Sequence, residues 1–202
     1  MTAKNLPILD KAEDANCLVI ALHAYTKGAD SLESVVRVIR KAPGFAQADI
    51  VRPDLPTGMF SAANMNALVK SVLRMVDECY SEKRYEEIYF VGHSVGGLLA
   101  RKVYVTAQGE TEEAPFETEL AGEPSRIWAN KVKRIVSLAG MNRGWRISNH
   151  LSIGTAIAVS VGTVVGRLVE LVTRKKLLIF QVHRGAPFPM HADFNIGRCC
   201  SL

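Results

Sequence analysis

The stretch IYFVGHSVGGLLA at residues 88–100 decides how this sequence folds, because its pattern changes abruptly in the middle. Residues 88–91 form a short, continuous apolar run, which is typical of a strand buried on both faces of a sheet. A helical pattern follows from about Val95 through Val105. We therefore predict a strand, a sharp turn and a helix, with a Gly-x-Ser-x-Gly motif at the turn.

Ser94 occupies the centre of this turn, so its hydroxyl is expected to project above the edge of the sheet. The strand and helix backbones must approach each other closely there. Gly92 and Gly96 meet that demand, and Gly97 relieves it further. The helix start adds backbone N–H groups and a positive dipole potential, with the Val95 N–H as one donor. The arrangement indicates a serine nucleophile beside an oxyanion site.

On both sides of this stretch, apolar runs alternate with helical patterns. We predict strands at Cys17–Leu22, Ala48–Val51, Glu87–Val91 and Val132–Ala139. We predict helices at Ser31–Arg40 and Ala62–Tyr80, with Ser31 and Ser61 as their N-caps. Such alternation is the signature of an α/β fold with a mostly parallel central sheet and helices on both faces. Residues 108–126 are polar and acidic, and we expect a surface excursion with solvated glutamates.

The segment from Gly92 through His93 and Ser94 to Gly97 resembles the nucleophile elbow of α/β-hydrolase-fold lipases and esterases, where G-H-S-x-G-G is a frequent form. Residues 135–144, IVSLAGMNRG, are similar to the strand that follows the nucleophile helix in lipase-like hydrolases. Asn142 and Arg143 depart from the Gly-Thr-Pro-x-x-Gly-like turn at its end.

Residues 18–25, LVIALHAY, resemble the strand and oxyanion loop of the same family, which often continues an apolar strand with His-Gly. Ala24 stands in place of that glycine. The resemblance implies that His23 shapes the loop. It also implies that the backbone N–H of Ala24 or Tyr25 is the second oxyanion donor.

The resemblance covers residues from about 16 to 145, some two thirds of the chain. It implies a single α/β-hydrolase-like domain over residues 1–202, active on carboxylic esters or lipid-like acyl substrates without a cofactor or metal. A serine nucleophile also needs a base that is oriented by a carboxylate, in the chain order Ser, Asp or Glu, then His.

That acid and base are not obvious in this sequence. Glu170 with His183 or His191 satisfies the chain order, but Glu170 lies in a helical pattern rather than at a strand end. His191 and Asp193 would pair in the reversed order. The resemblance therefore implies that the chain lacks the C-terminal part that delivers the acid and base in complete members of the family.

Residues 151–166 contain no charge, and the apolar run continues to Val172 with only Arg167 and Glu170 added. About 20 apolar residues can span a bilayer, so a membrane helix is one interpretation. We favour a helical lid or cap over residues 145–185 that covers an acyl pocket. The stretch 151–172 would then also allow contact with a membrane surface.

Composition excludes several other classes. The chain has 48% hydrophobic and 22% charged residues and a net charge of +5, as an ordinary globular protein has. Its basic residues are scattered, which argues against a nucleic-acid partner. The four cysteines show no disulfide or zinc spacing, and residues 1–10 lack a signal-peptide core, so a cytoplasmic location is expected.

Two functional hypotheses remain. The first is a carboxylic-ester hydrolase that acts through an acyl-enzyme on Ser94. The second is a catalytically incomplete relative that binds a lipid, a protein or a membrane through its apolar segment. Covalent labelling of Ser94 distinguishes them.

Overall fold

A computed structural model describes residues 7–59, 61–112, 115–140 and 176–182, together with positions 167, 171 and 188. Its strands are β1 (Ile8–Asp10), β2 (Cys17–Leu22), β3 (Asp49–Arg52), β4 (Glu87–His93) and β5 (Val132–Leu138). They form one sheet in the order β1-β3-β2-β4-β5. The last four of these run parallel, and only β1 is antiparallel to its neighbour. This confirms the mostly parallel α/β sheet expected from the sequence.

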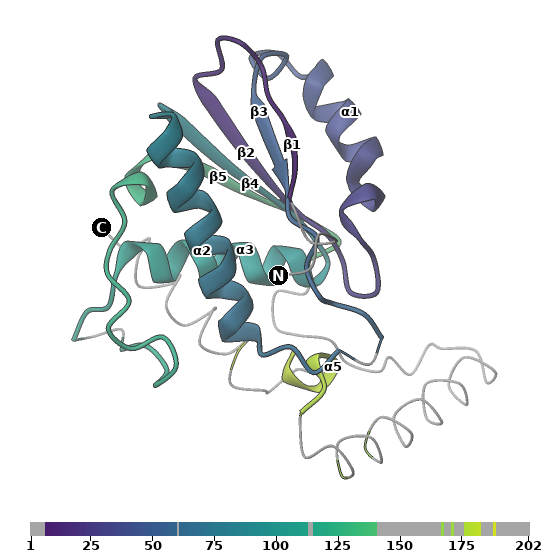
Figure 1. Cartoon of the computed structure of the whole chain (residues 1–202), viewed down its shortest axis with the longest axis vertical. Coiled ribbons are helices and arrows are strands. Elements are labelled where there is room, and N and C mark those ends of the chain that lie inside the picture. Colours follow the sequence, from purple (N-terminus) through teal and green to yellow (C-terminus); the bar gives the residue numbers. More distant parts are fainter. Residues whose placement is uncertain are drawn as a thin grey trace, which may run out of the picture.

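The helices lie on both faces of the sheet, with α1 on one side and α2 and α3 on the other (Figure 1). Their bounds are α1 (Glu33–Lys41), α2 (Met65–Glu82), α3 (Val95–Gln108) and α5 (Leu178–Gln181), with 3-10 turns η1 (Ala29–Leu32) and η2 (Ile127–Lys131).

The side chains of β2 point alternately to the two faces of the sheet, which explains how both faces become buried. Leu18 and Ile20 pack in the larger core with α2 and α3, whereas Val19 packs with Val36 of α1 in a second cluster. Successive side chains of a strand point to opposite faces, so an apolar run without interruption fills both cores. Every residue of β2 is buried.

The strand register brings the carboxyl ends of three strands to one edge of the sheet. Leu22 pairs with Gly92, and His93 pairs with Leu138. The residues after β2, β4 and β5 therefore lie beside one another at this edge. In open α/β sheets, binding sites form at the carboxyl ends of the strands.

Both predicted helix caps are wrong. Leu32 is the N-cap of α1, because a 3-10 turn precedes the helix, and the Ser31 hydroxyl donates to Gly28 O instead. The N-cap of α2 is Asn64, whose side-chain oxygen accepts from the N–H groups of Asn66 and Ala67. Ser61, the expected cap, lies three residues earlier and donates to Pro56 O.

The acidic segment 108–126 is not simply a solvated excursion. Phe116 and Leu120 join the core beneath α2 and α3. Glu117 lies 2.7 Å from the Nζ of Lys102, whose side chain is fully buried in α3. Burial lowers the pKa of Lys102, and the hydrogen bond that Lys102 donates to Glu117 opposes that shift. The segment therefore closes one side of the core through a buried ion pair.

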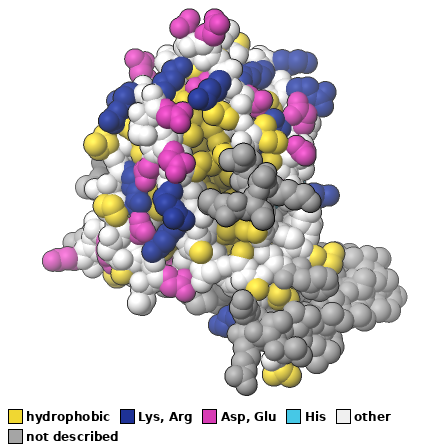
Figure 2. Space-filling view, in the orientation of Figure 1, with side chains coloured by type: hydrophobic (Ala, Val, Ile, Leu, Met, Phe, Trp, Pro, Cys, Tyr) yellow, Lys and Arg dark blue, Asp and Glu magenta, His cyan; other side chains and the backbone are white. Residues whose placement is uncertain are grey.

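The outer surface in the view of Figure 1 is mixed in charge. Figure 2 shows Lys and Arg side chains interspersed with Asp and Glu, with hydrophobic side chains between them. Within the described part of this face, neither sign forms a continuous field.

Most of the apolar segment 151–172 and of the expected cap 145–185 lies outside the described residues. Within the described part, no helix is long and apolar enough to cross a membrane. The guanidinium carbon of Arg167 lies 4.0 Å from the Phe180 ring centroid. Gln181 of α5 accepts from Met65 N and donates to Ala63 O, which fastens α5 to the start of α2.

Candidate active site

Ser94 has an unusual backbone conformation at the turn that the sequence predicts. It lies between β4 and α3 with φ 55° and ψ −116°, in the region that L-residues rarely adopt. Such strain costs about 1–3 kcal/mol and persists only where neighbouring contacts impose it. Here, Ser94 N donates to Leu138 O at 2.9 Å, and Ser94 O accepts from Gly97 N at 3.1 Å. The side chain is half-buried.

The glycines around Ser94 are required by close backbone contacts. A Cβ on Gly92 would lie 2.3 Å from Gly97 N, and one on Gly96 would lie 2.3 Å from Leu22 O. Neither backbone group can move without displacing a strand or a helix. The prediction that small residues must flank the serine is therefore confirmed. A Cβ on Gly97 would meet the Ser137 Oγ at 2.3 Å, where a hydroxyl can rotate away.

Val95 is the first residue of α3, and its side chain is buried. The first N–H groups of a helix have no intrahelical partner, so the Val95 amide lies at the positive end of the α3 dipole. This amide directly follows Ser94. The arrangement suits a developing negative charge next to the serine oxygen.

His23 is fully buried just after β2, and both of its ring nitrogens are engaged. The Nε2 accepts from Leu55 N at 2.8 Å, and the Nδ1 lies 2.9 Å from Ala24 O. Because the Leu55 amide can only donate, Nε2 is unprotonated and Nδ1 carries the proton. These contacts tie the loop after β2 to the loop after β3.

Ala24 and Tyr25 continue from His23 at the same edge of the sheet. Ala24 is buried, and φ is positive at Thr26 (61°) instead of at Ala24. The alanine in place of the family's glycine is therefore compatible with this backbone. The Tyr25 hydroxyl donates to Met59 O, and burial raises the pKa of Tyr25.

His93 is half-buried, directly before Ser94 in β4. All histidines after Ser94 lie outside the described residues. The same holds for every candidate triad partner, namely Glu170, His183, His191 and Asp193. The structure therefore brings together Ser94, the amides of the elbow and the His23–Tyr25 loop. The loop after β3 also belongs to this group through its contact with His23, and no motif in the sequence singles it out.

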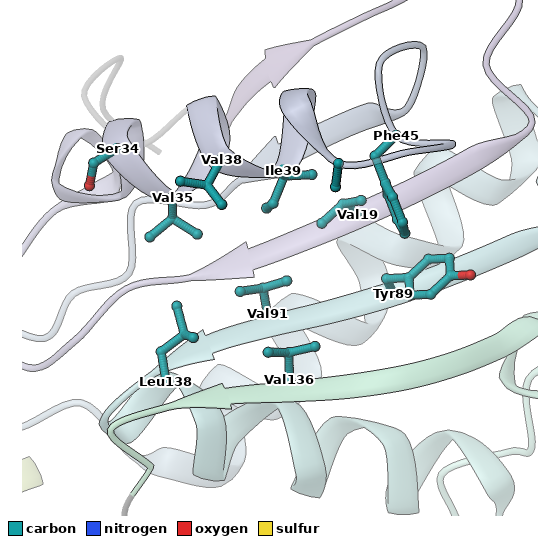
Figure 3. A pocket seen from close by; sticks show the side chains of 11 residues that line it. Val19, Ser34, Val35, Val38, Ile39, Phe45, Tyr89, Val91, Val136 and Leu138 are labelled. Carbon is teal, nitrogen blue, oxygen red and sulfur yellow. The ribbon is translucent and has the colours of Figure 1, made fainter.

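The two larger of three cavities found among the described residues lie apart from Ser94, as does the third. An apolar groove of about 410 Å³ lies between α1 and the sheet, with Val35 and Ile39 facing Val19, Val91 and Val136 (Figure 3). A second, more polar cleft of about 620 Å³ lies between the start of α2, the 117–119 segment and α5. Ser94 is not one of the described residues that line these two cavities. No group of three metal-ligating side chains occurs in the part of the chain that the structure describes.

No protein-family model matches the sequence, and no curated protein matches it. Solved structures do match. A monoacylglycerol lipase from Paleococcus ferrophilus is 14% identical over 79% of this chain and 51% of that chain, with a TM-score of 0.46. A structure from work on carboxylesterases of Nitrososphaera gargenis is 13% identical over 70% and 43%, with a TM-score of 0.47.

A third match is an α/β hydrolase from the metagenome of lagoon sediments at Mar Chica, Morocco. It is 17% identical over 84% of this chain and 62% of that chain, with a TM-score of 0.41. The chain spans about half the length of the first two structures. The α/β fold itself is shown by the mostly parallel sheet and by the helices on both of its faces.

Proposed function

We propose that the chain is a serine hydrolase that cleaves carboxylic esters through an acyl-enzyme on Ser94. One observation carries the proposal: a serine in a strained backbone conformation at the end of a central strand, next to the first amide of a helix. A glycine on each side is held against backbone atoms, so the turn cannot relax without moving β2 or α3. Strain kept in this way is common at catalytic positions.

In this proposal, the Ser94 Oγ attacks the ester carbonyl carbon. The new C–O bond forms as the serine proton passes to a base, and the carbonyl oxygen becomes an oxyanion. The N–H of Val95 and the N–H of Ala24 or Tyr25 stabilise that charge. Collapse of the intermediate expels the alcohol, which takes up the proton. Water then hydrolyses the acyl-enzyme in the same way.

The base and its carboxylate remain proposals from the sequence. Glu170 with His183 or His191 keeps the order of the family, whereas His191 with Asp193 reverses it. His23 does not serve as the base, because its ring nitrogens hold Ala24 O and Leu55 N.

The substrate class is likewise proposed from the sequence, together with the resemblance to lipases and esterases. An apolar cap over 145–185 would suit an acyl or lipid-like ester, with contact to a membrane surface through 151–172 and a cytoplasmic location. Apolar pockets with a few placed polar groups are the usual form of such sites.

Turnover of p-nitrophenyl esters of increasing acyl length tests the proposal. We expect Ser94→Ala to lower kcat by at least about 1,000-fold, because the nucleophile is removed. Ser71→Ala is the matched control, since Ser71 is an exposed serine on α2. Equal turnover by Ser94→Ala and the wild type would contradict the proposal.

The second candidate is a hydrolase-like binding module without activity. The sequence favours it in one respect, because no obvious acid and base follow Ser94 in the chain order that the family uses. A wild-type protein that is folded by near-UV circular dichroism but turns over none of these esters would select this function.

A further inference from the structure

The loop after β3, residues 53–59, contacts every residue of the His23–Thr26 segment. Leu55 N donates to His23 Nε2, and the Thr57 hydroxyl donates to Ala24 O at 3.4 Å. Thr26 N donates to Thr57 O at 2.7 Å. The Tyr25 hydroxyl donates to Met59 O. Four consecutive residues are thus held by one neighbouring loop.

Thr57 is at the centre of these contacts. It is a polar residue with only 2% exposure, and both its hydroxyl and its carbonyl bind the 23–26 segment. Its own N–H donates to Leu55 O at 2.7 Å, which makes a tight turn within the loop. Thr57 therefore cannot shift without changing both of its bonds to that segment.

These contacts orient one peptide unit. The Ala24 carbonyl and the Tyr25 N–H belong to the same planar peptide and point in opposite directions. Donors from His23 Nδ1, the Thr57 hydroxyl and Lys27 N all lie at Ala24 O. Because the carbonyl is held on that side, the Tyr25 N–H is directed away from it.

The following residue completes the constraint. Thr26 has φ 61°, a value that a β-branched residue seldom adopts, and its N–H is bonded to Thr57 O. The peptide units before and after Tyr25 are therefore both bonded to Thr57. A rotation of the peptide between Ala24 and Tyr25 would break bonds on both sides.

We propose that Thr57 is a positioning residue that sets the direction of the Tyr25 N–H, and that this N–H serves as the second oxyanion donor. The inference rests on the proposed function for its catalytic consequence only. The coupling between Thr57 and the Tyr25 amide is a property of the fold.

The catalytic test compares Thr57→Val with Thr57→Ser. Valine keeps the shape of threonine but lacks the hydroxyl, and serine keeps the hydroxyl. We expect Thr57→Val to lower kcat for p-nitrophenyl esters by about 10-fold with little change in KM, because an oxyanion donor acts mainly in the transition state. Thr57→Ser should restore kcat. An unchanged kcat in Thr57→Val would overturn the positioning role.

The second test does not depend on catalysis. In the wild type, Thr57→Ser and Thr57→Val, the NMR resonance and hydrogen exchange of the Tyr25 amide are measured. We expect the resonance to shift and the exchange to quicken in Thr57→Val only. An unchanged amide in Thr57→Val overturns the inference, whether or not esters are cleaved. A shifted amide in a protein that cleaves no ester upholds the coupling and removes the proposed function.

Discussion

Gly96 brings α3 against the end of β2, because its missing side chain leaves room for the carbonyl groups of Leu22 and His23. A Cβ at position 96 would lie 2.3 Å from Leu22 O and 2.9 Å from His23 O. The same contact places the first turn of α3 next to the loop that begins at His23. The absence of a side chain at Gly96 therefore allows the serine turn and the proposed oxyanion loop to approach each other closely.

We predict that Gly96→Ala costs about 3 kcal/mol in the free energy of unfolding, because backbone atoms of a central strand must move to admit the methyl group. Urea denaturation measures this cost. Gly58→Ala is the control, because a Cβ at Gly58 meets nothing within 4 Å. Equal midpoints for the two variants would show that α3 and β2 are less closely packed than described.

At the scale of single residues, the sequence predicts those features whose cause lies within a few neighbouring residues. The spacing of Gly92, Ser94 and Gly96 predicts the turn because the strand and helix around it are evident in the same stretch. Lys102 and Glu117 were not foreseen as a pair, since nothing local marks a lysine in an apolar helix face as bonded to a glutamate 15 residues later. Thr57 was missed for the same reason.

Among the elements, the strands that are buried on both faces were predicted to within a residue or two at their ends. β2 agrees fully with its prediction, whereas β4 runs on to His93. β1 was not anticipated, because its three residues are too short for a pattern and it depends on pairing with β3. The caps at Ser31 and Ser61 were misplaced because several capping residues compete near each helix start.

The segment before β5 is joined to α2 by a cluster of ion pairs. Glu123 lies 2.7 Å from Arg126 and 3.3 Å from Lys70, and Arg126 lies 3.5 Å from Asp77. The hydrogen bond from Arg126 holds the pKa of Glu123 below its ordinary 4.5, against the effect of burial. The cluster fixes the connection between α3 and β5 on the surface of α2.

We predict that Glu123→Gln lowers stability by about 1 kcal/mol near neutral pH, where the wild-type carboxylate is ionised and paired. A folded-state pKa below 4.5 stabilises the protein above 4.5, and that contribution is lost as the pH falls through the lowered value. The difference between variant and wild type should therefore vanish in acid. Thermal melts across the pH range measure it.

Glu112→Gln is the matched control for this prediction, because it removes the same charge from an exposed position of the same segment. A pH-independent difference for Glu123→Gln would mean that the glutamate acts through packing and not through its charge.

Across the whole molecule, the two faces of the sheet are covered unequally. α2 and α3 both pack on one face, whereas on the other face an apolar groove lies between α1 and the sheet among the described residues. Leu138 links the groove to the site, since its side chain lines the groove and its carbonyl accepts from Ser94 N. The contacts of α5 with Ala63 and Met65 connect the C-terminal part to the start of α2.

At this scale, the sequence predicts the layers and the position of the serine, but not the complete reaction centre. The base and acid depend on contacts between distant segments, and Glu170, His183, His191 and Asp193 show no local pattern that selects a pair. The central claim therefore concerns Ser94 alone.

Mass spectrometry of the protein after reaction with a fluorophosphonate tests that claim most directly. The tryptic peptide from Tyr85 to Arg101 contains a single serine, Ser94, so an adduct on this peptide identifies the site. We predict one phosphonyl group per chain on this peptide and none in Ser94→Ala. A folded wild-type protein that remains unmodified, or that is modified only elsewhere, would contradict the account.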